Sequence, residues 1–218
     1  MYQNHEKLPN IGQDGQRKLL KSTVTILGIG SVGSKVAELM VRAGVGLRLV
    51  DRDRVYEQDL IKQGVFVQDH VSKFKAKEAK KELERINAAV KVRTFHEDLS
   101  KQNIFLIDGA DMVIDCSNNL DIASLLAAHC KKAKVPLITC FYSGEKAFIF
   151  HQSAKTYVDA VRSKLEKELA KDDGALGATT SICASIVTTE AFKVLLAKQP
   201  TQGLITVNAW TPSIKISR

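Results

Sequence analysis

The feature that most constrains this chain is a glycine-rich loop, Gly28-Ile-Gly30-Ser-Val-Gly33, that directly follows the apolar run at residues 24–27. Residues 31–43, after the first glycines, place apolar side chains at the spacing of an amphipathic helix. Between a strand and a helix, Gly28 permits a tight turn, Gly30 lets a phosphate approach the backbone, and Gly33 lets the helix pack closely. Exposed N–H groups and the helix dipole attract anions there. The sequence therefore predicts a nucleotide-binding strand–loop–helix unit.

The same alternation continues along the chain. Short apolar runs predict strands at residues 24–27, 47–50, 90–95, 112–115, 137–141, 146–150, 204–210 and 214–216. Helical spacing predicts helices at residues 31–43, 75–86, 121–132, 157–169 and 176–197. Strands that alternate with helices form parallel sheets covered by helices. We therefore expect a Rossmann-like, doubly wound α/β fold with a mainly parallel sheet and helices on both faces.

The last third of the chain departs from this alternation. The charged stretch from Tyr157 to Leu169 carries an apolar residue every four positions, which predicts an amphipathic helix. The two final strands lie on either side of a turn at Pro212, which predicts a short antiparallel C-terminal extension. Because there is no repeat, low-complexity segment or convincing linker, residues 1–218 are predicted to form a single domain.

Charge leaves the class of partner open. The formal net charge is +8, which permits a nucleic-acid or acidic-protein partner. The lysines at residues 73–81 alternate with Glu78 and Glu82, as on a solvated helix face with i,i+4 pairs.

No apolar run is long enough to span a bilayer, and the polar start is no secretory signal. We expect a cytoplasmic protein without membrane association.

The cysteines argue against a structural zinc site and a thioredoxin-type redox motif. Cys116, Cys130, Cys140 and Cys183 are widely spaced and form no CxxC pair, so no zinc is expected. Most of them are predicted to be small core residues. The histidines show no HxxxH spacing that would place two ligands on one helix face.

Asp51 adds a second element to the nucleotide hypothesis. It ends the second predicted strand, about 20 residues beyond the glycines, where an acidic side chain is placed to bond ribose hydroxyls. Up to this point in the chain, NAD and ATP are equally compatible ligands.

Further motifs favour ATP. The segments are Asp51-Arg-Asp53-Arg-Val-Tyr-Glu-Gln-Asp59-Leu-Ile-Lys62-Gln63, Val71-Ser-Lys73-Phe-Lys75-Ala76 and Asp115-Cys-Ser-Asn118-Asn119. With the glycine loop, a lead-in helix at residues 12–19 and closing strands at residues 204–218, they resemble the ThiF/MoeB/HesA family, bacterial relatives of ubiquitin-activating enzymes. The resemblance covers roughly the whole chain.

This resemblance implies an ATP-dependent adenylyltransferase that uses magnesium. Its protein substrate would be a small ubiquitin-like or sulfur-carrier protein, activated at the C-terminus as an acyl-adenylate. The implied contacts are phosphates for Gly28, Gly30 and Gly33, ribose for Asp51, phosphate for Lys75, and positions bordering the same site for Asp53 and Gln63. Cations are needed because two anions must react. A homodimer, or a heterodimer with a related subunit, is also implied.

The sequence departs from the family at four positions. Asn118 stands where the family has its magnesium-binding aspartate, and it is the only candidate metal ligand, without a charge. Lys62 replaces an arginine and loses the bidentate fork. Asp59 replaces an asparagine, and Asn4 stands where a partner-reaching arginine is expected. The implied catalytic set is therefore Lys75, Lys62 and Asn118, with an altered charge.

Four functional hypotheses remain open. The first is an active adenylyltransferase, and the second is a degenerate or partner-dependent member that binds nucleotide and a partner protein. The third is a relative that modifies tRNA by ATP-driven dehydration, for which no stacking aromatics beside a basic stripe are found. The fourth, an NAD-dependent oxidoreductase, leaves residues 59–75 unexplained. The region of the family's cysteine-bearing crossover loop, residues 151–175, contains no cysteine, so Cys140 and Cys183 are catalytic candidates only by default.

Overall fold

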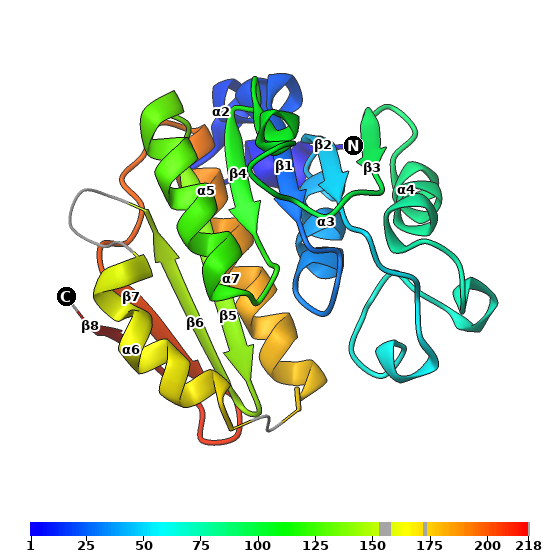
Figure 1. Ribbon diagram of the computed structural model, residues 1–218. Helices are drawn as coiled ribbons and strands as arrows, with labels where there is room; N and C mark the ends of the chain where they lie inside the picture. Colours follow the sequence, from blue (N-terminus) through cyan, green and yellow to red (C-terminus); the bar gives the residue numbers. More distant parts are fainter. Residues whose placement is uncertain (153–157, 172–173, 218) are drawn as a thin grey trace.

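The computed structural model describes residues 1–152, 158–171 and 174–217, which form an α/β fold around one mixed sheet (Figure 1). The strands are β1 Thr23–Leu27, β2 Gly46–Val50, β3 Val92–Phe95, β4 Met112–Asp115, β5 Leu137–Ser143, β6 Lys146–His151, β7 Leu204–Asn208 and β8 Ser213–Ser217. The α-helices are α1 Gln3–Glu6, α2 Gly12–Lys21, α3 Gly33–Arg42, α4 Lys75–Ile86, α5 Leu120–Ala133, α6 Val158–Leu169 and α7 Gly177–Leu195. Short 3-10 helices are η1 Glu57–Asp59, η2 Gln68–His70 and η3 Ile104–Ile107.

The strand order explains where a ligand can bind. The eight strands follow the order β3-β2-β1-β4-β5-β6-β7-β8. The first five are parallel, and β6, β7 and β8 extend the sheet by antiparallel pairing. Because the chain order reverses between β1 and β4, their carboxyl ends flank a switch point, where open α/β sheets bind ligands. The predicted doubly wound sheet and antiparallel extension are confirmed.

Helices cover both faces of the sheet. In Figure 1, α5 and α6 lie in front of the strands, and α3 and α7 lie behind them. Strand side chains alternate between these layers, as the two-residue period requires. Val24 and Ile26 of β1 belong to the core beneath α3 and α7, whereas Leu27 belongs to the core beneath α5. A third cluster joins α5 and α6 to Phe141, Phe148 and Phe150. Each layer of the predicted fold therefore has its own buried apolar contacts.

Several predicted boundaries differ slightly from the structure. β3 begins at Val92 rather than residue 90, because the N–H of Val90 bonds the carbonyl of Asn87 in a turn after α4. β7 ends at Asn208, whose side chain accepts the N–H of Thr211 and closes the turn to β8. The predicted lead-in helix is confirmed as α2, and the predicted helix from Tyr157 is confirmed from Val158, with Tyr157 itself outside the described residues.

The four cysteines are all buried free thiols, which confirms their prediction as core residues. Contact with Cys140 and burial raise the pKa of Cys116 and Cys183 well above the ordinary value for a thiol. Within the described part of the chain, no helix combines the length and hydropathy needed to cross a bilayer.

Candidate nucleotide-binding site

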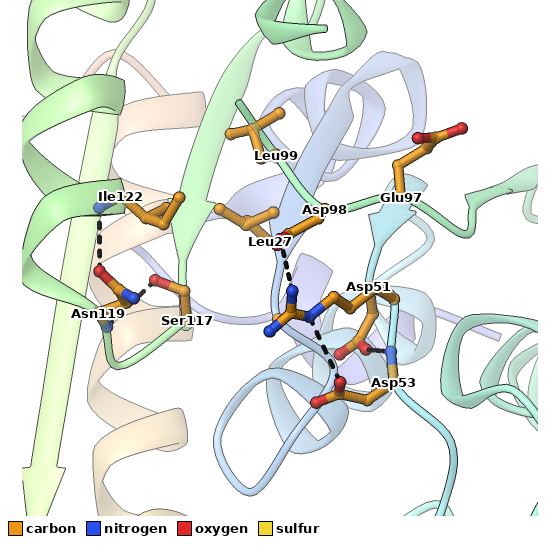
Figure 2. Close-up of a pocket in the computed structure, with 11 residues that line it drawn as sticks. Leu27, Asp51, Asp53, Glu97, Asp98, Leu99, Ser117, Asn119 and Ile122 are labelled. Atoms are coloured by element: carbon orange, nitrogen blue, oxygen red, sulfur yellow. Dashed lines mark hydrogen bonds and ion pairs between the residues drawn. The ribbon is translucent and has the colours of Figure 1, made fainter. Parts of the chain in front are cut away.

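A pocket of about 170 Å³ lies at the carboxyl ends of β1, β2, β3 and β4 (Figure 2). Figure 2 shows Asp51 and Asp53 on one side of this pocket, Ser117 and Asn119 on the other, and Leu27 between them. The residues that line it are Leu27, Gly28, Asp51, Arg52, Asp53, Glu97, Asp98, Leu99, Ser117, Asn119 and Ile122. The loops that follow these four strands therefore meet at the switch point of the sheet.

The three glycines of the loop differ in how closely other atoms surround them. Gly28 has a φ of +79°, and a Cβ there would lie 2.8 Å from the carbonyl oxygen of Cys116. A Cβ on Gly33 would overlap the carbonyl oxygen of Gly28. A Cβ on Gly30, in contrast, would meet no atom of the described residues within 4 Å. Gly28 and Gly33 are thus required by packing, whereas the absence of a side chain at Gly30 leaves open space beside the backbone.

Asp51, directly after β2, stabilises this loop by hydrogen bonding. Its Oδ2 accepts the backbone N–H of Ile29 at 2.5 Å, and its Oδ1 accepts the N–H of Asp53 at 2.7 Å. Burial raises the pKa of Asp51, while these two backbone hydrogen bonds and Lys75 oppose the shift. The carboxylate therefore both fixes the glycine loop and lines the pocket.

The pocket wall is acidic. Asp51, Asp53, Glu97 and Asp98 all line it, against one arginine, Arg52. Arg52 pairs with Asp98 at 2.6 Å and lies 3.7 Å from Asp53. Such a wall favours hydroxyl and amino donors of a nucleoside and repels phosphates. This wall is therefore better suited to a nucleoside than to phosphates.

Lys75, at the start of α4, is almost completely buried beside the pocket. Its Nζ lies 3.1 Å from Oδ2 of Asp59 and 3.9 Å from Oδ2 of Asp53. Lys75 does not line the pocket itself, but it lies next to Asp53, which does. The structure thus brings Lys75 to the acidic end of the site and pairs it with an internal carboxylate.

Asn118 lies between two pocket residues, but its side chain bonds the neighbouring strand. Its Oδ1 accepts the N–H of Tyr142 at 2.9 Å, and its Nδ2 donates to the carbonyl of Tyr142 at 3.3 Å. Its backbone has a φ of 55°, a left-handed conformation that asparagine tolerates. Within the described ranges, no group of three or more His, Cys, Asp or Glu side chains is arranged to hold a metal. Asn118 is therefore not part of a carboxylate cluster in the described structure.

Lys62 and Gln63 follow η1 and do not line this pocket. Lys62 is half-buried, and none of the described carboxylates forms an ion pair with it. Gln63 is buried, and its Oε1 lacks a hydrogen-bond partner among the described residues. Of the residues expected from sequence, Gly28, Asp51 and Asp53 therefore line the pocket, and the others do not.

A further acidic residue, Asp115, lies at the end of β4 with no exposed surface. Its Oδ1 accepts the N–H of Ser117 at 3.0 Å, and its Oδ2 has no partner among the described residues. Burial raises the pKa of Asp115 to about 7. This carboxyl supports the backbone of the pocket loop and is uncharged through the acidic range.

Sequence reasoning did not identify several pocket residues: Arg52, Glu97, Asp98, Leu99, Ser117, Asn119 and Ile122. Glu97–Leu99 come shortly after β3, and Ser117 and Asn119 come shortly after β4. Their position after parallel strands could have indicated these residues, because the carboxyl ends of parallel strands share one edge of the sheet. Asn119 also caps α5 by accepting the N–H groups of Asp121 and Ile122.

Together, the strand order and the pocket at its switch point define a Rossmann-like α/β protein. A family model described as "ThiF family" matches residues 2–218, and the chain belongs to that family. The protein HesA, vegetative, of Trichormus variabilis is 31% identical over 95% of this chain and 80% of its own length. The molybdopterin-synthase adenylyltransferase of Haemophilus influenzae is 31% identical over 87% of this chain and 81% of its own length.

Other matches are partial. The protein HesA of Nostoc sp. is 31% identical over 65% of this chain and 57% of its own length, so the matched segment spans little more than half of that relative. A crystal structure of Escherichia coli MccB with ATP superimposes with a TM-score of 0.80 at 19% identity, over 93% of this chain and 65% of that one. At this identity the similarity establishes the fold.

Proposed function

We propose that this protein is an ATP-dependent adenylyltransferase that activates the C-terminal carboxylate of a sulfur-carrier or ubiquitin-like protein. The observation that supports the proposal is the polarity of the site, with open space beside the backbone at Gly30 and a carboxylate wall around Asp51. One end suits phosphates and the other suits a nucleoside. The relative named as a molybdopterin-synthase adenylyltransferase supports the same reaction class.

The proposed reaction places two anions in contact, because a carboxylate attacks the α-phosphate and displaces pyrophosphate. Protein cations that contact the phosphates would reduce this repulsion. Lys75 and Lys62 are the proposed cations, although the internal pair with Asp59 already neutralises much of the charge of Lys75. We propose that Mg²⁺ enters with ATP, held mainly by phosphate oxygens, since Asn118 is engaged by Tyr142.

Replacing Asn118 by aspartate tests whether this position faces the metal. A carboxylate retains the acceptor for the N–H of Tyr142, loses the donor to the carbonyl of Tyr142, and adds the charge that an amide lacks. We expect ATP to bind about tenfold more tightly in the presence of Mg²⁺, or ~1.4 kcal/mol. Calorimetric titration with and without Mg²⁺ measures the difference. An equal affinity in the variant and the wild type at saturating Mg²⁺ would show that position 118 does not face the metal.

Trapping the intermediate tests the reaction itself. The protein is incubated with ATP, Mg²⁺, hydroxylamine and one of several sulfur-carrier or ubiquitin-like proteins, whose masses are then measured. An acyl-adenylate converts to a hydroxamate only at an activated carboxyl carbon, so a modified C-terminal glycine is expected with the correct carrier. A carrier that lacks this glycine is the control. If ATP binds but no carrier in the panel is modified, unaided adenylation is rejected.

A second candidate is a nucleotide-binding subunit that needs a partner for catalysis. The Asp59–Lys75 pair and the engaged side chain of Asn118 favour this alternative, because both reduce the charge available for chemistry. The two candidates differ in whether a related subunit must be added before the carrier is modified.

We further propose that the protein acts as a homodimer or heterodimer through the exposed side of α7. Its exposed residues are uncharged, and the hydroxyls of Ser181, Ser185 and Thr189 donate to carbonyls one turn earlier in the same helix. This face can therefore be buried without unpaired hydroxyl donors. Ser185→Arg is expected to shift a dimer to monomer in light scattering, whereas Asp69→Arg, on an exposed loop residue, is expected to leave the mass unchanged.

A further inference from the structure

The buried ion pair between Asp59 and Lys75 lies next to the proposed nucleotide site. The two side chains are 8% and 7% exposed, and their charged atoms are 3.1 Å apart. A second carboxylate, Asp53, lies 3.9 Å from the same ammonium group and lines the pocket. Water screens a buried pair poorly, so Asp59 neutralises most of the charge that Lys75 presents to a ligand.

Asp59 also has a local structural role that does not need its charge. Its Oδ2 accepts the backbone N–H of Tyr56 at 3.0 Å and closes the 3-10 turn of η1. The amide oxygen of an asparagine accepts such a hydrogen bond equally well. What aspartate adds over asparagine at this position is therefore a negative charge directed at Lys75.

We propose that Asp59 is an internal counter-anion that competes with nucleotide phosphates for Lys75 and sets the preference of the site among adenine nucleotides. The proposal rests on the proposed function, in that an adenine nucleotide occupies the site. A ligand with more phosphates must share Lys75 with Asp59, so each added phosphate gains less than it would beside a free ammonium. The site accordingly discriminates weakly between ATP and AMP, and the acidic wall that receives the nucleoside supplies much of the affinity.

The test compares AMP and ATP binding to the wild type and to Asp59→Asn by calorimetry. In the variant, the ratio of the AMP Kd to the ATP Kd is expected to rise about tenfold, or ~1.4 kcal/mol, mainly through tighter ATP binding. The matched control is Asp69→Asn, which removes the same charge from an exposed residue of η2 and is expected to leave the ratio unchanged. Because the ratio is measured on the folded fraction, partial loss of folding does not mimic the effect.

A double variant addresses the unpaired cation that Asp59→Asn leaves behind. Asp59→Asn combined with Lys75→Gln replaces the ion pair by two neutral amides of similar size, a change that proteins often tolerate. The rise in the Kd ratio that is expected in Asp59→Asn should disappear in this double variant, because the rise depends on the ammonium group of Lys75.

The outcomes separate this proposal from the proposed function. An unchanged Kd ratio in Asp59→Asn, or a ratio that stays raised in the double variant, overturns the role of Asp59 while ATP binding stands. If neither the wild type nor Asp59→Asn binds AMP or ATP, the nucleotide assignment fails, and the role of Asp59 fails with it.

Discussion

Replacing Gly33 by alanine is expected to lower the free energy of unfolding by about 3 kcal/mol and to abolish nucleotide binding. The added methyl would overlap the carbonyl oxygen of Gly28 and lie 3.3 Å from Cβ of Cys116, so the loop must move away from the sheet. This loop also provides the N–H of Ile29 that Asp51 accepts, so the displacement extends to the pocket wall. Urea unfolding and calorimetric titration with ATP measure the two effects.

Gly30→Ala is the matched control, because it adds the same methyl group three residues earlier. None of the described atoms lies within 4 Å of that position, so the free energy of unfolding should stay within about 1 kcal/mol of the wild type. ATP affinity should nevertheless fall about tenfold, or ~1.4 kcal/mol, because the methyl occupies the approach to the loop. Equal affinity in Gly30→Ala and the wild type would contradict a phosphate at this loop.

Replacing Asp115 by asparagine is expected to stabilise the protein at pH 8. Raising the pKa of a carboxyl from 3.8 to about 7 costs its ionised form roughly 4 kcal/mol relative to the unfolded chain. The folded state therefore retains a proton that the unfolded state has lost, and stability falls as the pH rises from about 4 to about 7. Asparagine does not titrate and can still accept the N–H of Ser117 through its amide oxygen.

The measurement is urea unfolding of the wild type and Asp115→Asn at several pH values, without nucleotide. The variant should gain stability over the wild type between pH 4 and pH 7, by up to roughly 4 kcal/mol, and the gain should be constant above pH 8. Asp69→Asn changes an exposed carboxylate and should follow the wild type throughout. A stability difference that does not vary with pH would show that Asp115 is already ionised in the acidic range.

The repeating units of the fold were predictable because each follows from a local period. Glycines between a buried strand and an amphipathic helix specify the first unit, and the same strand–helix alternation specifies the next ones. Boundaries such as the start of β3 at Val92 depend on individual turn hydrogen bonds, like the one between Val90 and Asn87, which no local pattern specifies.

The site was predictable where motif and position coincide, at Gly28, Asp51 and Asp53. The acidic residues Glu97 and Asp98 belong to no motif, and they reach the pocket only because β3 is parallel to β2. The direction in which each side chain points was the feature that the sequence predicted least well. The family resemblance implied a phosphate contact for Lys75 and a metal contact for Asn118, but it did not indicate that Lys75 pairs with Asp59 or that Asn118 bonds Tyr142.

ATP–pyrophosphate exchange is the most direct test of the proposed function, because labelled pyrophosphate enters ATP only if the acyl-adenylate forms reversibly. The protein is assayed alone and with each member of a panel of sulfur-carrier and ubiquitin-like proteins, with Mg²⁺ throughout. Exchange that requires one carrier with an intact C-terminal glycine, and that Gly33→Ala abolishes, is the predicted result. Tight ATP binding without exchange in the presence of any carrier would contradict an unaided adenylyltransferase and would leave the partner-dependent subunit as the function to test.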